Sequence, residues 1–179
     1  MMTGFKKLFF ILSINVWVSI IISVVVSIYM AVAFDGFVDI TTFKMVVPMC
    51  TAIGTVVGSL FATIFNVGGF CTVVAHKLGA KPGTPGEVLI RNMAVITIML
   101  LIMNFAITAI THYYFGAPFS GAKAMMGASV LRPPTDLDLL LNAWFRPIPF
   151  LWGPCYVVSI IVDPICMWLS FKMFGISTK

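Results

Sequence analysis

One carboxylic acid stands inside an otherwise uncharged, apolar segment of the sequence. Asp163 lies nine positions before Lys172, in a run from Pro147 to Phe171 that holds no other charged residue. Along a helix that spacing corresponds to about 13 Å. Ionisable residues inside a bilayer are costly and often mark proton or ion pathways. Asp163 is therefore a candidate proton-binding group; the alternative is a neutral side chain that hydrogen-bonds a neighbouring helix.

Uncharged polar residues fall at a similar depth in the other apolar runs. Counted from Lys7 and Lys77, Asn15 and Asn66 lie about 12–16 Å along their helices. The set predicted to line one polar pocket is Asp163, Ser159, Asn15, Ser19, Asn66 and Asn104. Polar residues also hold membrane helices together by hydrogen bonds. These residues could therefore line a binding pocket or serve only as hydrogen bonds between helices, and both interpretations stay open.

Two further patterns have helical spacing. Asn104, Thr108 and His112 recur every four residues, which makes His112 a candidate relay or pH sensor. An interfacial, hydrogen-bonded histidine is the alternative. Gly54, Gly58 and Ala62 form a stripe of small residues that predicts close helix packing, either within one bundle or between two protomers.

The remaining reactive residue types form no known constellation. The 4 cysteines contain no CxxC pair, and the 2 histidines are isolated, so no metal site is expected. Whether Cys50 and Cys155 pair is left open. No nucleophile elbow, zinc-protease, phosphate-loop or haem motif is present. We therefore expect no cofactor and no enzymatic activity.

Composition determines which kind of element must carry these residues. Of 179 residues, 60% are hydrophobic and only 9% are charged, against about 25% charged in soluble domains. This excludes a soluble enzyme, a nucleic-acid-binding domain and a disordered tail. The bilayer is the expected partner, any small-molecule substrate is unidentified, and the net charge of +5 is interpreted as a signal of membrane topology.

Four uncharged or nearly uncharged runs are long enough to cross a membrane. They are Leu8–Phe34, Met45–Ala75, Asn92–Ala122 and Pro147–Phe171. A transmembrane helix needs about 20 apolar residues. The runs lack the alternation of barrel strands. The sequence predicts an all-α membrane protein with four transmembrane helices.

The positions of the lysines and arginines predict orientation. Seven basic residues fall on one side of the spans and four on the other, so both termini are expected in the cytoplasm. This predicts a multi-pass protein of the bacterial cytoplasmic membrane. Helix three should begin near Pro85, after Thr84. In the second outer loop, Thr135 and Asp136 resemble a helix start, and a short interfacial helix there would be anchored by Trp144 and Arg146.

The two halves of the chain correspond to each other. A shift of about 85 positions pairs Lys6 with Arg91, and one of about 95 pairs Cys71 with Cys166. We interpret residues 1–79 and 80–179 as tandem transmembrane hairpins.

The segment Ser19-Ile-Ile-Ile-Ser23 resembles helix one of an uncharacterised family of short bacterial two-helix membrane proteins. The run from Asn142 through Trp144 to Phe150, followed by Asp163-Pro164, is similar to the tryptophan and spaced-proline pattern of that family. The resemblance implies two such hairpins in tandem and brings no known activity. In architecture alone, the chain also looks like proteobacterial antimicrobial compound efflux transporters.

Two functions are consistent with these features. One is a small proton-coupled transporter that works as a homodimer, because four helices enclose little space alone. The other is a non-catalytic membrane subunit or scaffold of a larger complex.

Overall fold

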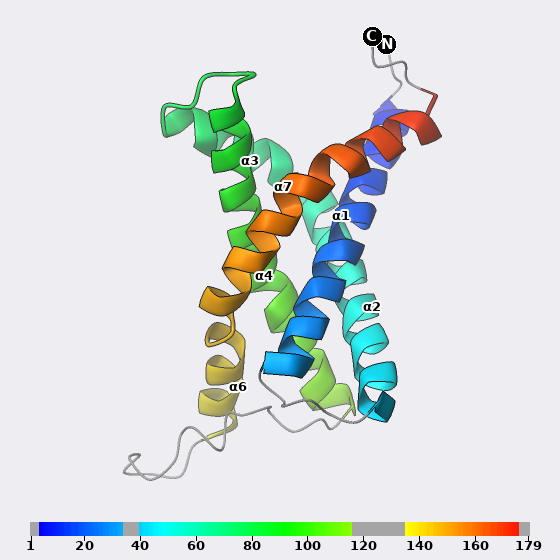
Figure 1. Cartoon of the computed structure of the whole chain (residues 1–179), viewed down its shortest axis with the longest axis vertical. Helices are drawn as coiled ribbons and strands as arrows, with labels where there is room; N and C mark the ends of the chain where they lie inside the picture. The colour runs from blue at the N-terminus through cyan, green and yellow to red at the C-terminus, as the bar shows by residue number, and fades with distance from the viewer. Residues whose placement is uncertain (1–3, 34–39, 116–134, 176–179) are drawn as a thin grey trace.

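The computed structural model describes residues 4–33, 40–115 and 135–175, and every element within them is a helix. The helices are α1 (Gly4–Ala33), α2 (Ile40–Ile64), α3 (Val67–Lys77), α4 (Pro85–Phe115), α6 (Asp136–Phe145) and α7 (Ile148–Met173). Figure 1 shows them as one elongated bundle.

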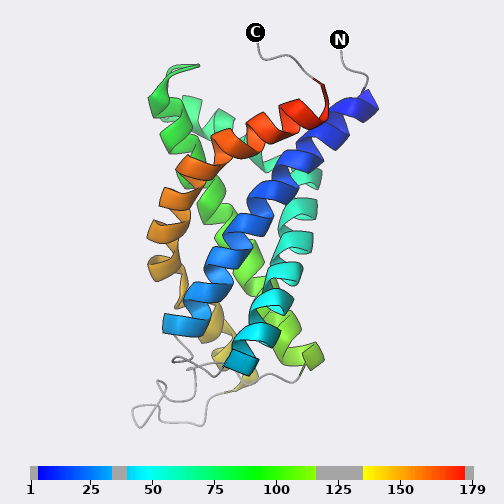
Figure 2. The ribbon, with the colours of Figure 1, turned by 45° about the vertical axis from the view of Figure 1, so that its right-hand side comes forward.

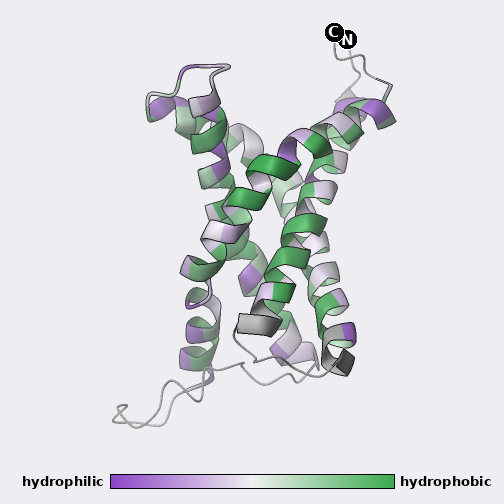
Figure 3. Ribbon diagram, viewed as in Figure 1, coloured by the Kyte–Doolittle hydropathy of each residue, from purple (hydrophilic) through white to green (hydrophobic). Residues whose placement is uncertain are grey.

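The prediction of four membrane-spanning helices is confirmed in length and composition. Among the described residues, 4 segments qualify: Phe5–Tyr29, Lys44–Ile64, Pro85–Tyr114 and Asp136–Met173. The last segment joins α6 and α7. Hydrophobic residues cover the middle of the bundle, whereas hydrophilic ones gather toward its ends (Figure 3). The chain is therefore a helical, multi-pass membrane protein.

The second predicted span is interrupted where the sequence suggested continuity. The run Met45–Ala75 predicted one helix, but α2 ends at Ile64 and α3 begins at Val67. Asn66 breaks the helix with a φ of 44°, a left-handed conformation that asparagine tolerates better than most residues. Gly68 and Gly69 lie inside α3, and Gly69 leaves room for the Asn66 side chain.

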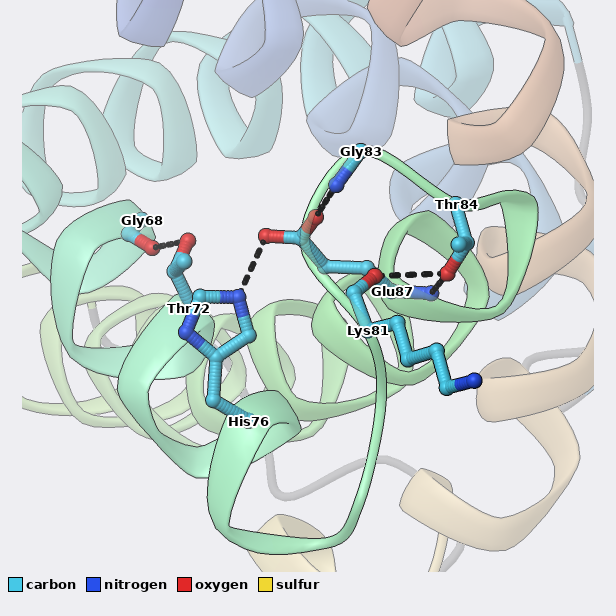
Figure 4. Close-up of polar contacts among 7 residues, drawn as sticks. All are labelled: Gly68, Thr72, His76, Lys81, Gly83, Thr84 and Glu87. Atoms are coloured by element: carbon cyan, nitrogen blue, oxygen red, sulfur yellow. Dashed lines mark hydrogen bonds and ion pairs between the residues drawn. The ribbon is translucent and has the colours of Figure 1, made fainter.

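The start of α4 at Pro85 agrees with the sequence. Thr84 Oγ1 accepts a hydrogen bond from the Glu87 amide at 3.4 Å, which is one half of a capping box. The Glu87 carboxylate binds elsewhere: Oε2 accepts from the Gly83 amide at 2.6 Å, and Oε1 lies 2.9 Å from His76 Nε2 (Figure 4). These contacts fasten the end of α3 to the start of α4.

The short helix predicted after Thr135 is present as α6. Thr135 and Asp138 form a complete capping box. Trp144 attaches the helix to α4, because its Nε1 donates to the Leu101 carbonyl at 2.8 Å and its own carbonyl accepts from Asn104 Nδ2. Thus α6 lies along the second half of α4; a position at the membrane interface stays a prediction.

Contacts between helices form a closed arrangement around a small core. Helix α1 packs on α2 and α7, and α4 packs on α2, α3, α6 and α7. The core includes Ile22, Val26, Ile96, Leu100 and Leu151. The beginning of α1, the end of α7 and the α3–α4 turn lie at one end of the bundle, whereas α6 lies at the other (Figures 1 and 2).

Candidate functional site

Asp163 lies in the middle of α7, where this helix changes partner. The first half of α7 runs beside α4 and its second half runs toward α1 (Figures 1 and 2). Pro164 follows Asp163 inside the helix. Since proline has no N–H, it leaves a carbonyl one turn earlier without its helical hydrogen bond. The acid therefore sits beside a weak point of the helix.

Two aromatic side chains fix the first half of α7 on α4. Trp152 Nε1 donates to Thr97 Oγ1 at 3.0 Å, and the Tyr156 hydroxyl donates to the Leu89 carbonyl at 3.4 Å. The rings stack on each other, with centroids 5.1 Å apart. Asp163 follows Tyr156 by two turns on the same face, so these bonds direct its carboxyl toward the first half of α4.

The carboxyl of Asp163 meets Asn92 and Arg91 of α4. Asn92 lies beside it, and Arg91 is within electrostatic range. The Asn92 amide lies within hydrogen-bonding reach of the carboxyl. Within the described part of the chain, however, neither Asp163 Oδ1 nor the two Asn92 amide atoms make a hydrogen bond of standard length and angle. Asn92 is only 1% exposed. Buried polar groups with so few hydrogen bonds are rare and costly, so this pair is the strongest candidate for a binding site.

Asn92 was not among the residues that the sequence pointed to. It stands next to Arg91 at the edge of an apolar run, where a polar residue is unremarkable. The signal that could have suggested it is depth: Asn92 lies 7 positions from the start of α4 and Asp163 lies 10 positions from the end of α7, and these two helix ends share one end of the bundle.

Most of the other predicted pocket residues have hydrogen-bond partners. Asn15 Nδ2 donates to Thr63 Oγ1 at 2.9 Å, which joins α1 to α2. Ser159 Oγ donates to the Tyr156 carbonyl at 2.9 Å, and Asn104 donates to Trp144. Asn66 is exposed at the break between α2 and α3. The structure thus does not gather the predicted set around Asp163.

Ser19 belongs to a row of buried serines on α1. The hydroxyls of Ser19, Ser23 and Ser27 have no hydrogen-bond partner among the described residues. A Cβ placed on Gly54 would come within 2.5 Å of Ser23 Oγ, and one on Gly58 within 3.1 Å of Ser19 Oγ. Ser19 and Ser23 therefore pack tightly against the glycine stripe of α2.

The glycine stripe faces the interior of the bundle. Besides the serines of α1, Gly54 adjoins Ile107 of α4 and Gly58 adjoins Met99 and Met103. Ala62 is buried in the core. Of the two alternatives for this stripe, the geometry favours packing within one protomer.

The histidines and cysteines are dispersed. His112 lies near the end of α4, with its ring 4.9 Å from that of Tyr113, whereas His76 belongs to the α3–α4 turn. Cys50 and Cys155 are separate buried thiols. Across the described ranges, no three His, Cys, Asp or Glu residues are grouped so that they could hold a metal ion.

Comparison of the chain with protein-family models, with curated proteins and with solved structures finds no match. Function is therefore argued from the site itself.

Proposed function

We propose that this protein is a proton-coupled membrane transporter in which Asp163 binds and releases the coupling proton. The observation that supports the proposal is the buried carboxyl of Asp163 beside the buried amide of Asn92, two groups in reach of each other whose hydrogen-bonding capacity is otherwise unused among the described residues. A carboxyl group that must alternate between two protonation states needs neighbours that suit both states.

Asn92 and Arg91 supply such neighbours. The Asn92 amide can donate to an ionised carboxylate through Nδ2, or accept from a protonated carboxyl through Oδ1. Arg91, the residue before Asn92 on α4, adds a positive charge that would attract an ionised Asp163. The neighbours therefore suit either protonation state of Asp163.

The shape of α7 offers a way to couple protonation to movement. Asp163 and Pro164 lie between the part of α7 held on α4 and the part that packs on α1. Protonation changes the attraction between Asp163 and Arg91, and thereby the contact between α7 and α4. A change there would alter the angle between the two halves of α7.

The transporter is proposed to work as a homodimer in the bacterial cytoplasmic membrane, with the α3–α4 turn on the cytoplasmic side. The substrate is expected to be a small or amphipathic organic molecule. Because Gly54 and Gly58 are occupied by contacts inside the bundle, the dimer contact would lie on another face.

A non-catalytic membrane subunit is the second candidate. The positive charge of Arg91 near Asp163 favours it, because attraction between the two side chains could simply hold α4 against α7. In that case Asp163 would not exchange protons during activity.

Proteoliposomes loaded with a pH-sensitive dye test the proposal. Ethidium, an amphipathic cation, is added outside under an imposed pH gradient, and ethidium uptake and proton release are recorded together. We expect coupled fluxes that disappear in Asp163→Asn and persist in Asp136→Asn, a matched change at the exposed start of α6. Undiminished proton flux in a folded Asp163→Asn protein would refute coupling through this residue. Purification with a fixed partner, without flux, would support the subunit.

A further inference from the structure

Basic residues from opposite halves of the chain meet at one end of the bundle. The Phe10 ring of α1 lies 5.1 Å from that of Phe171 and 5.7 Å from that of Phe174. Ser13 and Ser170 share a hydrogen bond of 3.1 Å one turn further in. The first turn of α1, with Lys6 and Lys7, therefore lies beside the last turn of α7, with Lys172 (Figure 2).

Among the residues that the structure describes, no acid neutralises the charge of these three lysines. Lys6, Lys7 and Lys172 are exposed, and within the described residues neither α1 nor the part of α7 beyond Asp163 contains an acid. Glu87 is engaged by His76 and Gly83 at the α3–α4 turn. We call Lys6, Lys7 and Lys172 the lysine cluster. Its positive charge is complementary to an anion.

Exposed aromatic side chains surround the lysine cluster. Phe5 is 72% exposed, Phe9 45% and Trp168 55%. The Lys172 ammonium lies 5.2 Å from the centre of the Trp168 ring. Tryptophan and lysine at the end of a membrane span are typical of the level where headgroups meet hydrocarbon. A free inorganic anion would use only the lysines, whereas a lipid would also use the aromatic surface.

We propose that the lysine cluster is a binding site for an anionic phospholipid. The headgroup phosphate binds Lys6, Lys7 and Lys172, and an acyl chain lies along Phe9 and Trp168. One lipid would thereby bridge α1 and α7. This site is distinct from Asp163 and does not depend on the proposed transport.

Titration of the purified full chain in detergent with phosphatidylglycerol tests the site, with phosphatidylcholine and inorganic phosphate as comparison ligands. Binding is followed by native mass spectrometry and by thermal unfolding. Near a charged membrane surface each lysine contributes about fivefold to affinity. We expect Lys6→Gln/Lys7→Gln/Lys172→Gln to lower phosphatidylglycerol affinity by at least about tenfold.

A matched variant removes the same charge elsewhere. Lys44→Gln/Lys77→Gln/Lys81→Gln should bind phosphatidylglycerol with nearly normal affinity. Lys6→Arg/Lys7→Arg/Lys172→Arg should also keep that affinity, and this result would show that substitution at the three positions leaves the protein folded. An equal loss in both glutamine variants would overturn the site in favour of general electrostatics. Equal affinity for phosphatidylcholine would refute headgroup selection, and full competition by inorganic phosphate would replace the lipid site with a simple anion site.

Discussion

Asn92 and Asn104 are two buried asparagines on one helix with opposite surroundings. Asn104 donates to the Trp144 carbonyl, whereas in the part of the chain that is described the Asn92 amide makes no hydrogen bond of standard geometry and has only the Asp163 carboxyl within reach. A buried polar group without a partner destabilises a protein by about 1–3 kcal/mol. A binding function for Asn92 would explain why the protein retains a residue that lowers its folding stability.

Substitution of Asn92 or of Asn104 by leucine distinguishes a binding function from a structural hydrogen bond. We expect Asn92→Leu to unfold near the wild-type temperature while transport falls, because the buried amide that is removed makes only a marginal contact with Asp163. Asn104→Leu should lower stability by about 1–3 kcal/mol, because the Trp144 carbonyl loses its donor. Thermal unfolding in detergent measures both. Equal destabilisation by the two substitutions would mean that the Asn92 amide is already satisfied in the native protein.

At the scale of single residues, the sequence identified Asp163 as a candidate because it is the one charged residue in an apolar run. Depth in the membrane was compatible with Asn92 but did not single it out as the neighbour of Asp163, and nothing singled out Thr63 as the partner of Asn15. The reason is physical: helical spacing defines which residues share a face, but the rotation of each helix is decided by packing against the others.

At the scale of elements, the glycines of α2 differ in how much room surrounds them. A Cβ on Gly54 would meet Ser23 Oγ at 2.5 Å and Ser23 Cβ at 3.2 Å, both close to the α1 backbone. At Gly58 the nearest atom is the flexible end of Met103, at 2.9 Å. Within the described residues, nothing lies within 4 Å of a Cβ on Gly153 of α7.

Alanine substitutions should therefore rank in a fixed order. We expect Gly54→Ala to cost about 1–3 kcal/mol, because α1 and α2 must separate, and Gly58→Ala to cost less, because Met103 can move. Gly153→Ala should be neutral or stabilising, since alanine favours a helix. Unfolding temperatures in detergent give the order. A harmless Gly54→Ala would contradict the tight contact with Ser23.

The elements themselves were largely predictable. Four spans followed from long apolar runs, and the starts of α4 and α6 followed from Pro85 and Thr135, since composition and caps act locally. The break between α2 and α3 did not follow. It depends on a single left-handed residue, Asn66, and the neighbouring Gly68 and Gly69 offered an equally plausible place for it.

At the scale of the whole molecule, the two ends of the bundle should face opposite sides of the membrane. The start of α1 and the α3–α4 turn share one end, and the start of α6 lies at the other (Figure 1). The four native cysteines are buried, so an introduced cysteine can be labelled selectively.

In intact cells, an impermeant maleimide should label Asp136→Cys, while Phe5→Cys and Lys81→Cys should react only after permeabilisation. This follows from the larger number of basic residues on the cytoplasmic side. Labelling is read by mass shift on a gel. If only one of Phe5→Cys and Lys81→Cys were labelled in intact cells, the arrangement of the helices would be contradicted. If both were labelled and Asp136→Cys were not, only the orientation in the membrane would be contradicted.

The pairing of α1 with α7 also bears on how the molecule is made. Ser13 and Ser170 bond although 157 positions separate them, so α1 contacts a helix that is synthesised well after it. Contacts between distant segments form late in folding. Until α7 is inserted, Ser13 lacks this partner, and that interval is when a membrane insertase or chaperone could hold α1.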